Sequence, residues 1–119
     1  MNDDQKNRLS LWRDASEIAA GIRTKAARLY LEIGQDEMGK RVGIKKSAVS
    51  MCERGKTYPG RRLMLYFKRN HRIDFNFFMD GDWVQLPGDV QSKLFPILQE
   101  LHAETDQVES SDLTLPFSS

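Results

Sequence analysis

The side chains best suited to chemistry lie in one short stretch, QDEMGKRVGIKKSAVSMCERG, at residues 35–55. It presents a lysine, two serines and a methionine at Lys46, Ser47, Ser50 and Met51. A lysine ammonium can donate to guanine O6 and N7, a serine hydroxyl can bond several bases, and a methionine can contact a thymine methyl group. The stretch therefore predicts contacts with the edges of base pairs.

Two short helices are expected to position these side chains, one over residues 35–42 and one beginning near Lys46. Gly43 turns the chain between them, because glycine adopts positive φ without steric strain. Neither helix is long enough to be stable alone in water, so the rest of the fold must hold the pair. Four apolar side chains at helical spacing are expected to face inward: Met38, Val42, Val49 and Cys52. The candidate base-contact side chains then lie on the other faces.

Cationic and polar residues flank the second helix of this pair. Such side chains suit contacts with DNA phosphates, which set the register of a protein on the duplex but carry no sequence information. The candidates are Gln35, Lys45, Arg54, Lys56, Tyr58, Arg61 and Arg62.

The remaining pattern predicts an all-α domain over residues 16–82, with no strand-like alternation. A helix over residues 16–31 ends at Gly34, another covers residues 61–69, and Asp74 is the expected N-cap of a short closing helix. The expected core residues of these three helices are Ile18, Ile22, Ala26 and Leu29, then Leu63 and Phe67, then Phe75, Phe78 and Met79.

Both ends of the chain lie outside this domain. Residues 1–15 form an N-terminal extension, polar and loose up to about residue 8. Residues 83–103 contain a further helix that either begins at Pro96 or is kinked there. Residues 104–119 are acidic and rich in serine, so we expect a disordered tail.

The apolar stripe of the C-terminal helix has two interpretations. It can pack on its own domain, or it can pair with a second copy, since dimers of DNA-binding helices span two half-sites about 34 Å apart. We favour a homodimer. The residues expected at its interface are Trp83, Leu86, Val90, Leu94, Ile97, Leu98 and Leu101.

The charges of the chain are strongly segregated. Residues 21–72 hold 14 Lys and Arg against 4 Asp and Glu, a net charge of +10, whereas residues 73–119 hold one lysine and nine acids, a net charge of −8. A polyanion that approaches the middle of the chain therefore meets a cation, although the whole chain carries only +1.

Composition excludes several other classes of protein. The single cysteine, Cys52, fits a core position in a reducing compartment, and the absence of a membrane-length apolar run or a secretion signal favours a cytoplasmic protein. The two histidines, His71 and His102, stand apart from other ligand types, so we expect no metal and no cofactor. No nucleophile–base set or phosphate-binding glycine loop is present, so we do not expect an enzyme.

The stretch at 35–55 resembles the helix-turn-helix of the Cro/repressor (Xre-type) family of small bacterial and phage DNA-binding proteins. Gln35 matches the glutamine that opens the family's second helix, and "ERG" at 53–55 matches its usual exit. The similarity extends over about residues 21–81, which implies a five-helix lambda-repressor-like domain with an added C-terminal helix. Two positions differ: Gly39, where alanine is more frequent, and Cys52, where a larger apolar residue is usual. Both differences are expected to loosen packing.

Three functions are consistent with these observations. The first is a sequence-specific regulator of transcription that binds double-stranded DNA as a dimeric repressor, with Lys46, Ser47, Ser50 and Met51 at the positions that the family uses to read bases. The second is the antitoxin of a toxin–antitoxin pair, in which the C-terminal region binds a basic toxin. The third is a protein-interaction module that has lost DNA binding. We favour the first.

Overall fold

A computed structural model describes residues 1–118, with side chains described for residues 1–105. Within that range all regular structure is helical: α1 (Asp3–Leu9), α2 (Glu17–Tyr30), α3 (Gln35–Val42), α4 (Lys46–Glu53), α5 (Arg61–His71), α6 (Phe75–Asp80) and α7 (Gly88–Ser118). The predicted all-α class is confirmed. No helix in this part of the chain is both long and apolar enough to cross a membrane.

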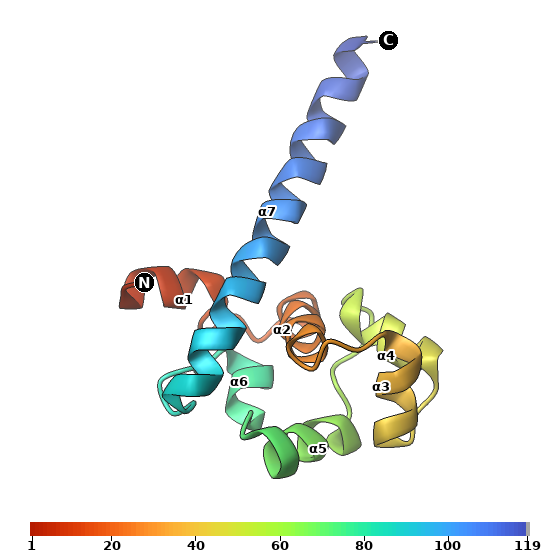
Figure 1. Ribbon diagram of the computed structural model, residues 1–119. Helices are drawn as coiled ribbons and strands as arrows, with labels where there is room; N and C mark the ends of the chain where they lie inside the picture. The colour runs from red at the N-terminus through yellow and green to blue at the C-terminus, as the bar shows by residue number, and fades with distance from the viewer. Residues whose placement is uncertain (119) are drawn as a thin grey trace.

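Helix α2 lies at the centre of the molecule. It contacts α7 on one side, α4 on another, and α6 as well, and Figure 1 shows the other helices arranged around it. The hydroxyl of its N-cap, Ser16, accepts a hydrogen bond from the Ala19 amide at 3.1 Å, which satisfies one of the free N–H groups at the helix start.

The stripe predicted for α2 is wrong at its first position. Ile18 is 66% exposed and lies against the backbone at Gly55. The buried face of α2 is instead built largely from small residues, such as Ala19, Ala20 and Ala27, which let neighbouring helices approach closely. Because helices pack on α2 from several sides, its buried face is wider than a single apolar stripe. The positions of its largest apolar side chains therefore do not show where the middle of that buried face lies.

Arg23 is a fully buried cation on α2. Its guanidinium donates to the carbonyl oxygens of Ser10 (2.8 Å), Phe78 (3.1 Å), Leu11 and Asp14, and so joins the segment after α1 to α6. Burial lowers the pKa of Arg23, an effect that nearby carboxylates oppose. Nothing in the sequence around Arg23 distinguishes it from the surface cations of the chain.

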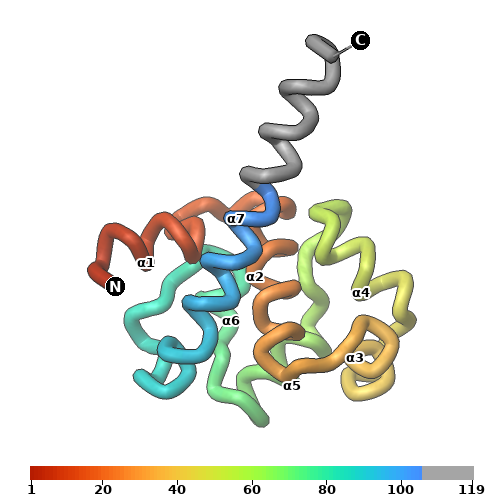
Figure 2. The backbone as a smooth tube through the Cα atoms, turned by 45° about the horizontal axis from the view of Figure 1, so that its top comes forward, coloured from red at the N-terminus to blue at the C-terminus, as the bar shows by residue number. Residues whose placement is uncertain are grey.

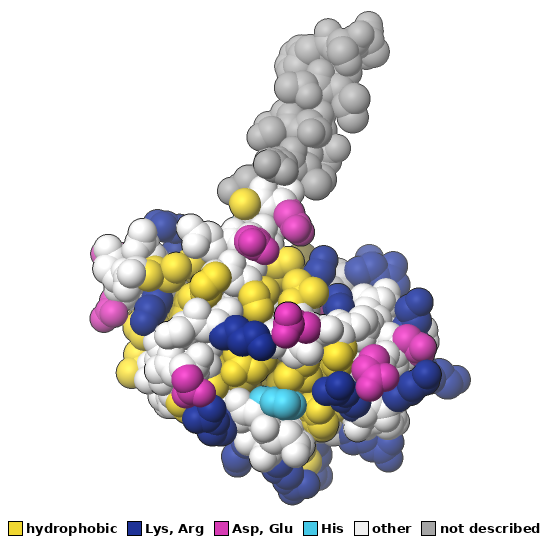
Figure 3. Space-filling model, in the orientation of Figure 1, with side chains coloured by type: hydrophobic (Ala, Val, Ile, Leu, Met, Phe, Trp, Pro, Cys, Tyr) yellow, Lys and Arg dark blue, Asp and Glu magenta, His cyan; other side chains and the backbone are white. Residues whose placement is uncertain are grey.

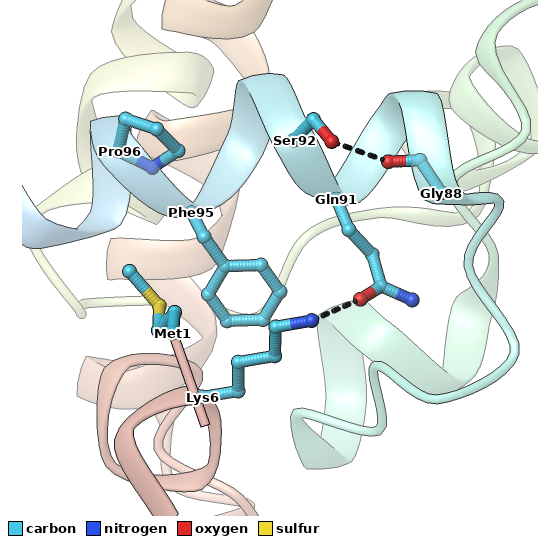
Figure 4. A pocket seen from close by; sticks show the side chains of 7 residues that line it. All are labelled: Met1, Lys6, Gly88, Gln91, Ser92, Phe95 and Pro96. Atoms are coloured by element: carbon cyan, nitrogen blue, oxygen red, sulfur yellow. Dashed lines mark hydrogen bonds between the residues drawn. The ribbon is translucent and has the colours of Figure 1, made fainter. Parts of the chain in front are cut away.

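The N-terminal residues are a folded helix, so the prediction of a loose segment is wrong. Asn2 and Gln5 form a reciprocal capping box at the start of α1. Helix α1 packs on α7, and Figure 4 shows the junction, where the Lys6 ammonium donates to Gln91 Oε1 at 2.8 Å beside the ring of Phe95. The indole of Trp83 donates to Asn7 Oδ1 at 2.8 Å and closes the same junction.

The last two elements of the predicted domain are present with small changes. Leu63 and Phe67 of α5 are buried, and the Asp74 carboxylate caps α6 by accepting from the Phe77 amide at 3.1 Å. Phe77, rather than the predicted Phe75, lies in the core beside Phe78. Helix α7 begins at Gly88, so it does not start at Pro96. The tail predicted at residues 104–119 lies almost wholly outside the residues whose side chains are described.

Candidate nucleic-acid interface

The helix pair α3–α4 is joined by a tight turn at Gly43, whose φ of 77° and ψ of 35° place it in the left-handed region. Its amide donates to the Gly39 carbonyl at 2.8 Å, and the Ile44 amide donates to the same oxygen at 2.9 Å. A residue with a Cβ would be strained in this conformation. The bounds and the turn predicted for this pair agree with the structure.

Gly39 allows α3 to approach the start of α4 very closely. A Cβ at this position would lie 2.6 Å from the backbone oxygen of Ile44, which is far inside van der Waals contact. The expectation that Gly39 loosens the packing is therefore wrong, because the missing methyl group lets the two backbones meet.

The inner face of α4 is anchored in the core. Val49 is fully buried and Cys52 is 3% exposed, while Met38 of α3 packs in the same core. Cys52 contacts the Thr24 hydroxyl of α2 at 3.5 Å, and burial raises the pKa of its thiol. Cys52 therefore has the environment of an inert core residue.

A buried ion pair fixes the C-terminal end of α4. The guanidinium of Arg28 donates to both carboxylate oxygens of Glu53, at 2.7 and 2.9 Å, and these side chains are only 10% and 3% exposed. Arg28 also donates to the Ile33 carbonyl at 2.8 Å, in the segment between α2 and α3. The sequence did not identify this pair, because Arg28 and Glu53 lie outside the predicted apolar positions and read as surface charges.

Gln35 belongs to the same network. Its amide donates to Glu53 Oε1 at 3.1 Å, and its side chain is half-buried. The residue predicted to contact phosphate therefore joins the start of α3 to the end of α4 in this structure.

The outer face of α4 carries the predicted base-contact residues. Lys46, Ser47 and Met51 are exposed, Met51 by 41%, and Ser50 is half-buried. The anchored inner face and the buried ion pair hold α4 so that this row of side chains points to solvent. A rigid helix with its N-terminal side chains exposed is suited to entering a major groove.

The predicted phosphate-contact residues surround α4. Lys45, Arg54, Lys56 and Arg61 are exposed. Arg62 is also exposed, and its Nη1 donates to the Gly43 carbonyl at 3.0 Å, so it is held against the α3–α4 turn. Tyr58 is 45% exposed, and its hydroxyl donates to the Ala15 carbonyl at 2.8 Å.

The starts of α3, α4 and α5 share a property that was not predicted from the sequence. Their N-caps are Gly34, Lys45 and Gly60, and none makes a side-chain capping bond. The starts of α1, α2 and α6 are each capped by a side chain. Free amides at the positive end of a helix dipole attract phosphate oxygens, so these three starts suit a polyanionic partner.

Residues 35–71, which span α3, α4 and α5 and the segments that connect them, hold 10 of the 18 Lys and Arg of the chain. Figure 3 shows Lys and Arg gathered on the right and lower edges of the molecule, over α3, α4 and α5. In the described range no group of three or more His, Cys, Asp and Glu could hold a metal ion. The cationic surface over α3, α4 and α5 is suited to binding an anion.

The residues predicted to form a dimer interface are mostly buried within one chain, so that prediction is corrected. Trp83, Leu86 and Leu101 are 3–8% exposed, Val90, Leu94 and Leu98 are fully buried, and Ile97 is half-buried against the core. Figure 2 shows α7 lying across α1 and α2. Periodicity showed that this helix has an apolar face, and that face is covered by the chain's own helices.

Comparisons with protein-family models, with characterised proteins and with solved structures each gave no match.

Proposed function

We propose that this chain is a helix-turn-helix regulator of transcription that binds specific sequences of double-stranded DNA, with α3 and α4 as the helix-turn-helix and α4 in the major groove. The observation that carries the proposal is the outward row of Lys46, Ser47 and Met51 on a helix whose opposite face is fixed in the core. The resemblance to the Cro/repressor family supports the same assignment.

Each part of the surface has a distinct role in this proposal. Lys46, Ser47, Ser50 and Met51 contact base edges and select the sequence. Lys45, Arg54, Lys56, Arg61 and Arg62, together with the uncapped helix starts, contact phosphates and set the register. Gln35 and Tyr58 lie at the edge of the proposed interface. Their main role is structural, because the Gln35 amide is bonded to Glu53 and the Tyr58 hydroxyl to Ala15.

The protein acts as a homodimeric repressor in this proposal, and the dimer forms through a surface other than the buried face of α7. Two copies on a duplex would read half-sites about one helical turn apart. The spacing of half-sites in selected DNA therefore reports on the dimer directly.

Selection of bound duplexes from a random pool tests the proposal. We expect one enriched motif, and we expect Lys46→Ala with Met51→Ala to weaken binding to it by about tenfold or more, since each base contact contributes about 1–3 kcal/mol of discrimination. A matched control is Lys93→Ala with Val84→Ala, which removes one charge and one exposed apolar side chain elsewhere. Failure to enrich any motif with the wild-type chain would overturn the proposal.

A further inference from the structure

A second basic feature lies between α3 and α5. A surface cavity of about 310 Å³ opens there, walled by the end of α3 and by one face of α5. Arg62, Tyr66 and Arg69 are spaced four and three residues apart on α5, so they share this face. The lining residues are Arg41, Val42, Arg62, Leu65, Tyr66, Arg69 and Asn70, and we call this feature the arginine groove.

The arginine groove is cationic along its length. Arg41, Arg62 and Arg69 are all exposed, and none of its described lining residues is acidic. Arg41 is paired with a carboxylate of its own helix, Glu37, which accepts from Arg41 Nε at 3.1 Å in an exposed pair on α3. Such an exposed pair is weak and gives way readily to a stronger anion.

Two of the three guanidinium groups are already oriented. Arg41 Nη1 donates to the Tyr66 hydroxyl at 3.4 Å across the groove, and Arg62 Nη1 donates to the Gly43 carbonyl at 3.0 Å. A guanidinium that makes one of these bonds retains further N–H donors in the same plane. Two such donors can bind two oxygens of one phosphate.

We infer that the arginine groove binds backbone phosphates of the DNA outside the base pairs contacted by α4. This inference rests on the proposed function and extends the binding surface to Arg41 and Arg69. The groove is continuous with the proposed interface, because Arg62 lines it and also bonds to the turn that precedes α4. Arg62 belongs to the first turn of α5, whose N-cap, Gly60, makes no side-chain capping bond.

The other polyanionic candidate is an acidic segment from a second copy of this chain. Residues 73–119 have a net charge of −8, so such a contact is electrostatically possible. DNA fits better, because Arg62 of the groove also bonds to the turn that precedes α4, so one backbone could contact both the groove and the proposed interface. The two occupants predict different effects of the same substitutions.

The test uses two double variants. The groove variant carries both Arg41→Gln and Arg69→Gln, and the control variant carries both Arg8→Gln and Arg13→Gln. Both variants remove two exposed cations, but the control removes them near α1. Binding to the selected duplex is measured from 50 to 200 mM salt. Two lost phosphate contacts flatten the slope of log K against log salt by about 1.8. Between 50 and 200 mM salt, the factor by which the affinity falls should therefore be about 12 times smaller for the groove variant than for wild type.

The position of the contacts gives a second readout. Ethylation of individual phosphates should interfere with wild-type binding at sites beside the α4 half-site, and this interference should disappear in the groove variant while the preferred base sequence stays the same. A general loss of folding would instead lower the melting temperature and weaken binding at all salt concentrations.

Three results would overturn the inference. An unchanged salt slope and interference pattern in the groove variant would show that DNA does not enter the groove, while leaving the proposed function intact. A self-association of wild type that is lost in the groove variant, with DNA binding unchanged, would assign the groove to a second copy. Absence of any DNA binding by wild type would remove the proposed function and this inference together.

Discussion

At the scale of single residues, the most consequential contact is the ion pair between Arg28 and Glu53. It joins α2 to the end of α4, and Gln35 adds a bond from α3 to the same carboxylate. Three helices thus meet at one glutamate that is 3% exposed. The orientation of α4 depends on this contact at its C-terminal end, as it depends on Gly43 at its N-terminal end.

Replacement of Glu53 by alanine should destabilise the protein by about 3 kcal/mol, because the buried Arg28 would lose its counter-charge. Urea unfolding measures this change. Glu37→Ala is the matched control, since it removes an exposed carboxylate paired with Arg41 and should change stability by about 0.5 kcal/mol or less.

A double replacement of the pair separates two explanations for that loss. Arg28→Met with Glu53→Met removes both charges and keeps apolar volume, so it should recover much of the stability lost in Glu53→Ala. If the double variant is as unstable as Glu53→Ala, the loss comes from packing and not from an unpaired charge.

At the scale of elements, the junction of α3 and α4 is defined by the closeness of two backbones. Gly39→Ala improves helix propensity by about 1 kcal/mol, but it places a methyl group 2.6 Å from the Ile44 carbonyl. Because the Cβ is rigidly attached to the backbone of α3 and the oxygen belongs to the backbone just before α4, relief requires one of these segments to move, and overpacking of this kind destabilises by about 1–3 kcal/mol.

We therefore expect Gly39→Ala to lower the melting temperature by a few degrees, in spite of the better helix former. Gly88→Ala is a suitable control, because a Cβ at the start of α7 meets open space. A melting temperature of Gly39→Ala equal to or above that of wild type would contradict the close approach described for these helices.

The α3–α4 pair could be predicted from sequence because its signals are local. Apolar spacing placed Met38 and Val49 inside, and Gly43 marked the turn, so bounds and faces agree with the structure. Asp74 gave the start of α6 in the same way. The outward positions of Lys46, Ser47 and Met51 follow from the helical period once the inner face is known.

Features that depend on tertiary partners could not be predicted in this way. A periodic apolar face shows that α7 is buried on one side but does not identify the partner, and the partner proved to be the same chain. Arg23 and Arg28 read as surface charges, because burial of an arginine depends on carbonyl and carboxylate groups distant in sequence. The DNA contacts themselves stay a prediction.

At the scale of the whole molecule, α1 and the first part of α7 form a joined layer on the side of α2 that carries α6 (Figures 1 and 2). Leu9 is 8% exposed, and His102 of α7 bonds to its carbonyl oxygen at 2.9 Å. Together with the bond from Trp83 to Asn7, these contacts make the N-terminal residues part of the fold. Within this layer, α1 covers apolar side chains at the start of α7 that would otherwise face solvent.

Deletion of residues 1–8 should therefore lower the free energy of unfolding by about 2–4 kcal/mol, because it exposes Trp83 and Phe95 and leaves the Trp83 indole without its acceptor. Urea unfolding followed by tryptophan fluorescence measures both the stability and the new exposure of Trp83. The control is Asp4→Ala with Arg8→Ala, which alters two exposed side chains of α1 without changing the net charge and should leave the midpoint nearly unchanged. A deletion variant as stable as wild type would show that α1 is an appendage, and the burial of the α7 face would then require another partner, such as the second copy that the sequence first suggested.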